Sequence, residues 1–109
     1  MPDADGYPTA EELEKVKAWD AMAAPWGLVQ YLKAIWWAPD WGFYIYRSKD
    51  WLHKKPVWKL TLHTGGWSGN EDIISTLKGT MFWQLYWQGS RRGGHYWFQL
   101  PPKRKHHGS

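Results

Sequence analysis

The fold is decided by residues 58–100, which read WKLTLHTGGWSGNEDIISTLKGTMFWQLYWQGSRRGGHYWFQL. Residues 57–64, which begin one position before this stretch, alternate apolar and polar side chains and predict a half-buried strand. A glycine-rich loop then leads into a short helix that Gly79 ends. Residues 81–88 and 95–100 are rich in aromatic side chains, and they predict two more strands joined by a basic turn. The stretch therefore predicts a sheet with a helix inserted between its strands.

The residues before this stretch predict two helices and a further strand. Thr9 and Glu12 have the spacing of a capping box, in which each side chain satisfies a free backbone N–H at the start of a helix. Pro25 ends that helix and serves as the first residue of the second. The second helix has apolar residues at helical spacing, namely Leu28, Tyr31, Leu32, Ile35 and Trp36. Residues 43–48, FYIYRS, predict a strand antiparallel to the one at 57–64.

These elements follow the order α-α-β-β-α-β-β, and 109 residues is a length typical of one domain. We therefore predict an α+β fold, with a mainly antiparallel four-stranded sheet and helices packed on one of its faces. Residues 1–8 are predicted to be a flexible N-terminus and residues 9–102 to form the single α+β domain. Residues 103–109 are predicted to be a disordered basic tail.

The composition excludes several classes of protein. The chain has no cysteine, which excludes disulfides and thiolate metal sites and fits a cytoplasmic protein. Its first residues, MPDADGYPTA, are acidic and polar, and no apolar run is long enough to cross a bilayer. We therefore expect neither a signal peptide nor a membrane partner. The aromatic content of 18% excludes a disordered chain.

Charge is distributed unevenly along the sequence. Residues 1–24 carry six acidic and two basic residues. Residues 25–109 carry four acidic and twelve basic residues, so this larger part has a net charge of +8. A body of that charge attracts nucleic acid, a nucleotide or an acidic protein, and a plain solvated surface with a basic tail is the alternative.

Alternation along the strands divides the sheet into two faces. The face predicted to be buried carries Phe43, Ile45, Trp58, Leu60, Leu62, Trp83, Leu85, Trp87, Tyr96, Phe98 and Leu100. The opposite face carries Tyr44, Tyr46, Lys59, Thr61, His63, Gln84, Tyr86, Gln88, His95, Trp97 and Gln99. Exposed rings stack on bases or on partner side chains, so this second face is a candidate recognition surface. The alternatives are a solvated face whose rings pair across strands, and a homodimer interface.

The residues predicted to bind a partner are Trp67, Arg91, Arg92, His95, Trp97, Tyr86, Tyr46, Lys59 and His63. Arg91 and Arg92 lie in an expected turn, where two guanidinium groups suit phosphate or carboxylate, although a solvated turn explains them equally well. Trp67 lies in the glycine-rich loop before the third helix. That loop either holds an anion at the helix start or is a tight turn, and it lacks the G-K-[ST] of a phosphate-binding loop.

The sequence predicts no catalytic site, no metal site and no cofactor. Ser68 is not in a nucleophile elbow. His63 and His95 approach each other on the predicted open face, but neither has carboxylate or thiolate residues beside it to complete a metal site. Aromatic excess and basic turns without a catalytic constellation instead favour a binding protein.

Three segments resemble short uncharacterised proteins encoded by bacteriophages and mobile elements. The segments are WWAPDWGF (36–43), TGGWSGNEDII (64–74) and SRRGGHYWFQLP (90–101). The resemblance spans roughly residues 25–101 and implies a bacterial cytoplasmic location. It also implies an accessory protein that binds a host or phage component, a class that includes small inhibitors of host defence. It implies no residue roles.

The expected function is therefore that of a small non-enzymatic protein that binds a host or phage macromolecule. A host or phage protein is the expected partner, and inhibition of host defence is one such role. The alternative is nucleotide or single-stranded nucleic-acid binding through the aromatic, basic sheet face.

Overall fold

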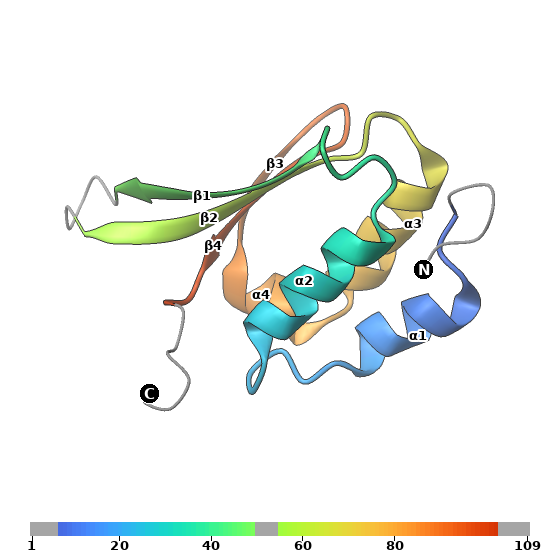
Figure 1. Cartoon of the computed structure of the whole chain (residues 1–109), viewed down its shortest axis with the longest axis horizontal. Coiled ribbons are helices and arrows are strands. Elements are labelled where there is room, and N and C mark those ends of the chain that lie inside the picture. Colours follow the sequence, from blue (N-terminus) through green and yellow to red (C-terminus); the bar gives the residue numbers. More distant parts are fainter. Residues whose placement is uncertain (1–6, 50–54, 103–109) are drawn as a thin grey trace.

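The computed structural model describes residues 7–49 and 55–102, which form four helices and four strands (Figure 1). In chain order these are α1 (Ala10–Ala18), α2 (Pro25–Ile35), β1 (Phe43–Lys49), β2 (Pro56–His63), α3 (Ser68–Lys78), α4 (Met81–Tyr86), β3 (Trp87–Arg91) and β4 (His95–Leu100). The predictions for residues 1–6 and for the basic tail at 103–109 lie outside the described residues. No helix of the described part is long and apolar enough to cross a membrane.

The four strands form one antiparallel sheet in the order β1-β2-β4-β3. All the helices lie on the same side of this sheet, so the other side is left open (Figure 1). The predicted α+β class, the antiparallel sheet and the one-sided helix layer are confirmed, as is the order of helices and strands, to which the structure adds α4.

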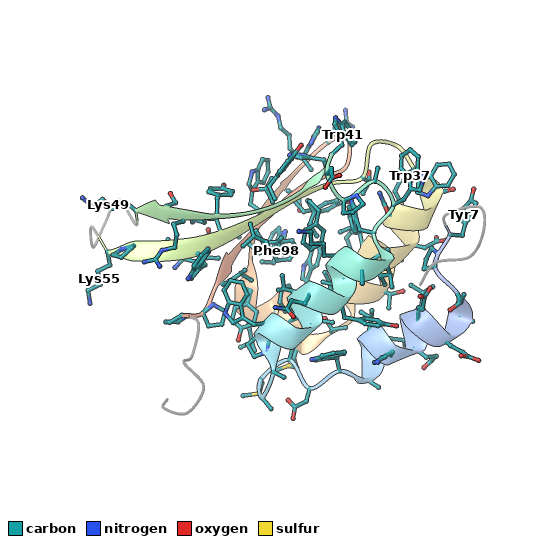
Figure 2. The ribbon with its side chains drawn as sticks, viewed as in Figure 1. Tyr7, Trp37, Trp41, Lys49, Lys55 and Phe98 are labelled. Atoms are coloured by element: carbon teal, nitrogen blue, oxygen red, sulfur yellow. The ribbon has the colours of Figure 1, made fainter. Side chains whose placement is uncertain are left out.

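The core lies between the sheet and the helix layer. Phe98 is fully buried at its centre, between β4 and the helices (Figure 2). Leu60 and Leu62 of β2 and Leu28 and Leu32 of α2 are also fully buried. Each such side chain contributes about 1.5–3 kcal/mol by leaving water. The alternation of β1, β2 and β4 is thus confirmed, because their predicted inner residues are buried or pack against the core.

Residues 81–86 form helix α4, so the strand predicted over 81–88 is wrong for most of its length. Thr80 caps the helix: its hydroxyl donates to the Leu77 carbonyl at 2.7 Å and accepts weakly from the Trp83 N–H at 3.5 Å. Phe82, Trp83 and Tyr86 pack toward the core at the i, i+1, i+4 spacing of a helix. Aromatic residues favour strands by propensity, and packing on the core overrides that preference here.

This helix changes which side chains the sheet presents. Leu85 and Trp87, predicted to be buried, are exposed, and Leu85 has 44% of its surface accessible. Gln84 and Tyr86 belong to α4 and are therefore not on the open side of the sheet. Strand β3 begins only at Trp87 and includes Arg91, which the sequence had placed in the turn.

Two helix starts differ in how they are capped. At α1 the predicted capping box is confirmed, with Thr9 N–H donating to Glu12 Oε1 at 2.8 Å and Glu12 N–H donating to Thr9 Oγ1 at 3.1 Å. At α3 the N-cap is Trp67, which makes no side-chain cap bond, and Ser68 is the first residue of the helix.

Candidate binding face of the sheet

The open side of the sheet is built from three cross-strand rows, which we call the open face. The first row is His63, His95 and Arg91, the second is Tyr44, Thr61, Trp97 and Gly89, and the third is Tyr46, Lys59 and Gln99. These rows follow from the register, because directly paired residues project to the same side of the sheet. The open face therefore carries two imidazoles and an arginine at one end, two rings in the middle, and a tyrosine, a lysine and an amide at the other end.

The first row contains a close pair of imidazoles. His63 Nδ1 and His95 Nδ1 lie 2.6 Å apart, and the ring of Tyr44 meets the His63 ring edge-on at a centroid distance of 5.8 Å. Backbone bonding holds the pair in place, since the His63 N–H donates to the Gly42 carbonyl at 2.8 Å. Arg91 extends this row on the edge strand and is exposed.

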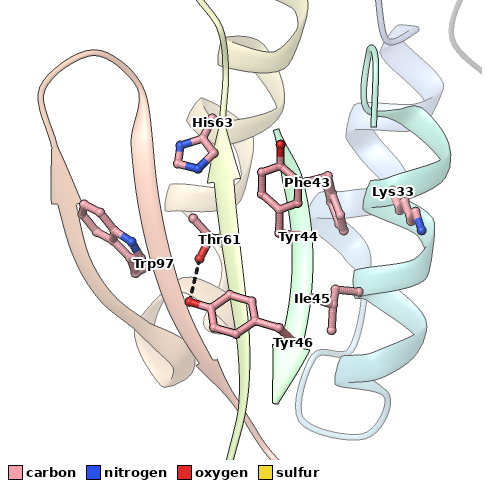
Figure 3. A pocket seen from close by; sticks show the side chains of 8 residues that line it. All are labelled: Lys33, Phe43, Tyr44, Ile45, Tyr46, Thr61, His63 and Trp97. Atoms are coloured by element: carbon pink, nitrogen blue, oxygen red, sulfur yellow. Dashed lines mark hydrogen bonds between the residues drawn. The ribbon is translucent and has the colours of Figure 1, made fainter. Parts of the chain in front are cut away.

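The second row places two rings on the same side of the sheet. Tyr44 is 42% exposed, and Trp97 is half-buried. Trp97 leans over Gly89, where a Cβ would lie 3.6 Å from the indole. Thr61 is buried between them and its hydroxyl meets the Tyr46 hydroxyl at 3.2 Å (Figure 3). Because Gly89 has no side chain, the Trp97 indole has room to lie over β3.

The third row is a network of amides around one lysine. Lys59 Nζ donates to Gln88 Oε1 at 2.9 Å and to Gln99 Oε1 at 3.2 Å. Gln88 Nε2 donates in turn to Gln99 Oε1 at 3.3 Å. Gln88 reaches this side of the sheet because the β3–β4 register shifts between Trp87 and Gly89. The amides orient the Lys59 ammonium without neutralising its charge.

Two shallow hollows lie on this face. The larger, about 690 Å³, has Tyr44, Tyr46, Thr61, His63 and Trp97 on the open side and continues past the edge of β1 to Lys33 (Figure 3). The smaller, about 310 Å³, is lined by His63, Arg91, Arg92, His95 and Trp97. Among the described residues neither hollow has an aspartate or glutamate in its lining. Arg91 and Arg92 give the smaller hollow a positive charge, which favours anionic ligands.

The structure brings seven of the nine predicted binding residues onto or beside the open face. These are Tyr46, Lys59, His63, Arg91, Arg92, His95 and Trp97. The placement predicted for Tyr86 is wrong, because it lies in α4 and packs on Phe82 at a ring distance of 5.1 Å. Trp67 lies away from the sheet, at the start of α3.

Trp67 belongs to a second exposed group, which we call the aromatic ledge: Tyr7, Trp37, Trp41 and Trp67. Trp67 stacks on Trp37 at 4.7 Å and meets Tyr7 at 5.0 Å. Trp41 lies against Gly65 of the glycine-rich loop. Trp37 and Trp41 are 43% and 56% exposed and lie at the same end of the molecule (Figure 2).

Sequence reasoning missed three members of this ledge, Tyr7, Trp37 and Trp41. The buried Asn70 builds the ledge by accepting from the Trp37 N–H at 2.8 Å and donating to the Trp37 carbonyl at 3.2 Å. These bonds join segments 33 residues apart. The only local signal was the consecutive pair of tryptophans at 36 and 37, of which Trp36 is buried and Trp37 exposed.

Acidification is expected to destabilise the protein through His63. Burial, followed by the nearby His95, lowers the pKa of His63 from its ordinary value of 6.5. The folded protein then binds fewer protons than the unfolded chain, so stability is complete above pH 6.5 and is lost as the pH falls through the lowered pKa. Thermal unfolding of the wild type and of His63→Gln between pH 7.5 and pH 5 measures this, and the wild type should lose more. An equal loss in both proteins would contradict it.

The turn beside the first row requires glycine at position 94. Gly94 has φ +83°, and a Cβ there would overlap the hydroxyl of buried Thr64. We expect Gly94→Ala to lower the free energy of unfolding by about 2–4 kcal/mol, combining overpacking with a left-handed backbone. Gly66→Ala is the control, because Gly66 has φ +75° but open space around it. Urea unfolding should show a larger loss in the free energy of unfolding for Gly94→Ala than for Gly66→Ala. Equal losses would contradict the predicted clash between a Cβ at position 94 and Thr64.

No family model, curated protein or solved structure matches this chain. The geometry defines it as a small α+β domain with an open, aromatic sheet face, and no carboxylate of the described residues lines the two hollows of that face. The functional conclusion rests on that face and on the ledge beside it.

Proposed function

We propose that this protein acts by binding rather than by catalysis, and that its open face holds single-stranded nucleic acid. The observation that carries the proposal is the placement of Tyr44 and Trp97 in one cross-strand row, between Lys59 on one side and Arg91 on the other. Rings that lie flat on a sheet beside cationic groups are the recurring arrangement for binding unpaired bases and their backbone.

The chemistry of each row supports one part of such a ligand. The rings of the second row offer stacking to bases of any sequence, which contributes about 1–3 kcal/mol per base. The amides of Gln88 and Gln99 offer hydrogen bonds to base edges. Lys59, Arg91 and Arg92 offer positive charge to phosphates, and among the described residues no carboxylate lines the hollows between them.

Single strands fit this face better than a duplex. Stacking on Tyr44 or Trp97 requires a base whose flat side is uncovered, and bases inside a duplex are covered by their neighbours. The helices of the described residues all lie on the other side of the sheet, so none of them projects from the open face to enter a groove (Figure 1).

Titration of the tryptophan fluorescence with a thymidine decamer tests the proposal. We expect saturable binding that weakens as salt rises from about 50 mM to about 200 mM, because bound phosphates release counterions. A double-stranded decamer should bind more weakly, and the thymidine decamer should be recovered intact after incubation. If the thymidine decamer does not bind at the lower salt concentration, the proposal is refuted. If the decamer is cleaved, the proposal that the protein acts without catalysis is refuted.

A protein partner is the second candidate, and the aromatic ledge favours it. Three of its four rings are exposed by a third of their surface or more, and exposed aromatic groups are enriched at protein interfaces. The resemblance to phage and mobile-element proteins suggests a host or phage protein, with inhibition of host defence as the role, in the bacterial cytoplasm. A partner captured from bacterial lysate should be retained by Arg91→Ala/Arg92→Ala and lost by Trp37→Ala/Trp41→Ala. Capture that survives both pairs of substitutions would eliminate this candidate.

A further inference from the structure

We propose that the smaller hollow of the open face binds the terminal phosphate monoester of a nucleic-acid strand. This inference rests on the proposed function, and it specifies which part of the strand occupies the end of the sheet formed by the first row. The hollow is the one lined by His63, Arg91, Arg92, His95 and Trp97.

The size and walls of the hollow suit the end of a strand. Its volume of about 310 Å³ is at the lower limit for small-ligand sites, so it holds a group of roughly nucleotide size. Trp97 lines both hollows, and it therefore stands where a terminal base would stack while its phosphate lies toward the arginines. The β3–β4 turn follows directly beyond Arg91, at the edge of the hollow.

The charge of the hollow suits a monoester better than an internal phosphodiester. Arg91 and Arg92 are exposed, and within residues 7–49 and 55–102 neither has a carboxylate partner. A phosphate monoester carries about −1.5 to −2 charges near neutral pH and has three oxygens to accept bonds, whereas an internal phosphodiester carries a single charge. Two guanidinium groups on adjacent residues therefore gain more from the strand's end than from its middle.

The histidine pair adds a donor set that depends on one proton. When both rings are neutral, one Nδ1–H donates to the other Nδ1, and only one of the two Nε2 atoms carries a hydrogen. One added proton leaves this bond in place and makes both Nε2 atoms donors. A second would put hydrogens on both Nδ1 atoms and break the bond. The singly protonated pair is therefore the form that suits an anion.

The surroundings of the pair leave it accessible to such a ligand. Gly93 has no side chain to cover His95 Nε2, since a Cβ there would lie 3.3 Å from that nitrogen. Of the residues that the structure describes, the charged and titratable groups that face the pair are Tyr44 from β1 and the two arginines from the end of β3 and its turn. From the helix side, Glu71 approaches only as far as the Thr64 hydroxyl, at 3.4 Å.

Three thymidine decamers test the inference: one with a 5′-phosphate, one with a 3′-phosphate and one with hydroxyl groups at both ends. Their dissociation constants are measured by tryptophan fluorescence at about pH 6 and at about pH 7.5. We expect one of the phosphorylated strands to bind about tenfold more tightly than the unphosphorylated strand at the lower pH, which corresponds to one strong charge-assisted interaction. Which of the two strands gains affinity identifies the end that is recognised.

Single-residue variants test whether the preference for the phosphorylated strand arises from the smaller hollow. Arg92→Ala, at an exposed turn position, should reduce the tenfold preference to about twofold or less, while the unphosphorylated strand loses only about threefold. Lys17→Ala is the matched control, because it removes one exposed positive charge from α1, on the helix side of the molecule, and should preserve the preference. Circular dichroism of each variant checks that the fold is retained.

The comparison of the two pH values tests how much of the preference for the phosphorylated strand depends on the histidine pair. The preference for the phosphorylated strand should fall by about threefold from pH 6 to pH 7.5 in the wild type, because the lowered pKa of His63 places its protonation below pH 6.5, and this change should disappear in His63→Gln. If all three strands bind equally in the wild type, the terminal-phosphate site is wrong and the proposed nucleic-acid function stands. If none of the three binds, both are wrong.

Discussion

Replacing Phe98 with alanine is expected to lower the free energy of unfolding by about 3–5 kcal/mol. Phe98 is 0% exposed, and its ring packs on Phe82 and Trp83 at centroid distances of 5.5 Å each. Through these contacts it joins β4 to α4, so the substitution leaves a cavity at the junction of the sheet with the helix layer. Urea unfolding followed by circular dichroism measures the loss.

The neighbouring residue supplies the control for this prediction. Trp97 is adjacent to Phe98 on β4 but projects to the open face, where it is half-buried. We expect Trp97→Ala to cost far less stability, about 1 kcal/mol. If the two substitutions destabilised the protein equally, the assignment of the two sheet faces would be wrong.

The second large effect is expected on binding. Replacing both Tyr44 and Trp97 with alanine should weaken binding of a thymidine decamer by at least about thirtyfold, because each ring contributes about 1–3 kcal/mol by stacking on a base. Both rings lie in the second row and are partly exposed. Fluorescence anisotropy of a labelled decamer measures the change, which avoids dependence on the tryptophan signal.

Trp41→Ala is the matched control for the double substitution. Trp41 is the most exposed member of the aromatic ledge, at 56%, and it lies outside the three rows of the open face. Its removal should leave the decamer affinity within about twofold of the wild type, as expected for a residue without ligand contact. A loss as large as that of the double variant would move the binding site from the sheet to the ledge.

Local sequence patterns were sufficient to predict most of the fold. The period of Leu28, Leu32 and Ile35 predicted α2, and the spacing of Thr9 and Glu12 predicted the cap of α1. Alternation predicted β1, β2 and β4 because each has one face on the core and one face open. These patterns succeed where a single periodicity fits the segment.

Prediction failed where two periodicities fitted the same residues. Phe82, Trp83 and Tyr86 satisfy a helical spacing, and the same stretch reads as alternating when Trp83, Leu85 and Trp87 are taken together. Propensity favoured a strand, but the cap at Thr80 and the burial of Phe82 favour the helix. The choice is made by tertiary packing, which the sequence does not display directly.

The candidate site was predictable to the extent that it follows from strand alternation. His63, His95 and Trp97 share a side because each lies at an even spacing from its neighbours on β2 or β4, and the register then pairs them. The aromatic ledge was not predictable in this way. It depends on Asn70 of α3 holding the backbone of Trp37, a contact that only the folded chain creates.

The central claim is that the open face, and not the ledge or the helix layer, binds single-stranded nucleic acid. A two-dimensional NMR titration with the thymidine decamer tests it most directly, because each tryptophan indole N–H gives its own signal. We predict that the Trp97 indole signal shifts with saturation, while the indole signals of Trp19 in the helix layer and of Trp37 and Trp41 on the ledge stay in place. Shifts confined to the ledge or the helix layer, or no shifts at all, would contradict the claim.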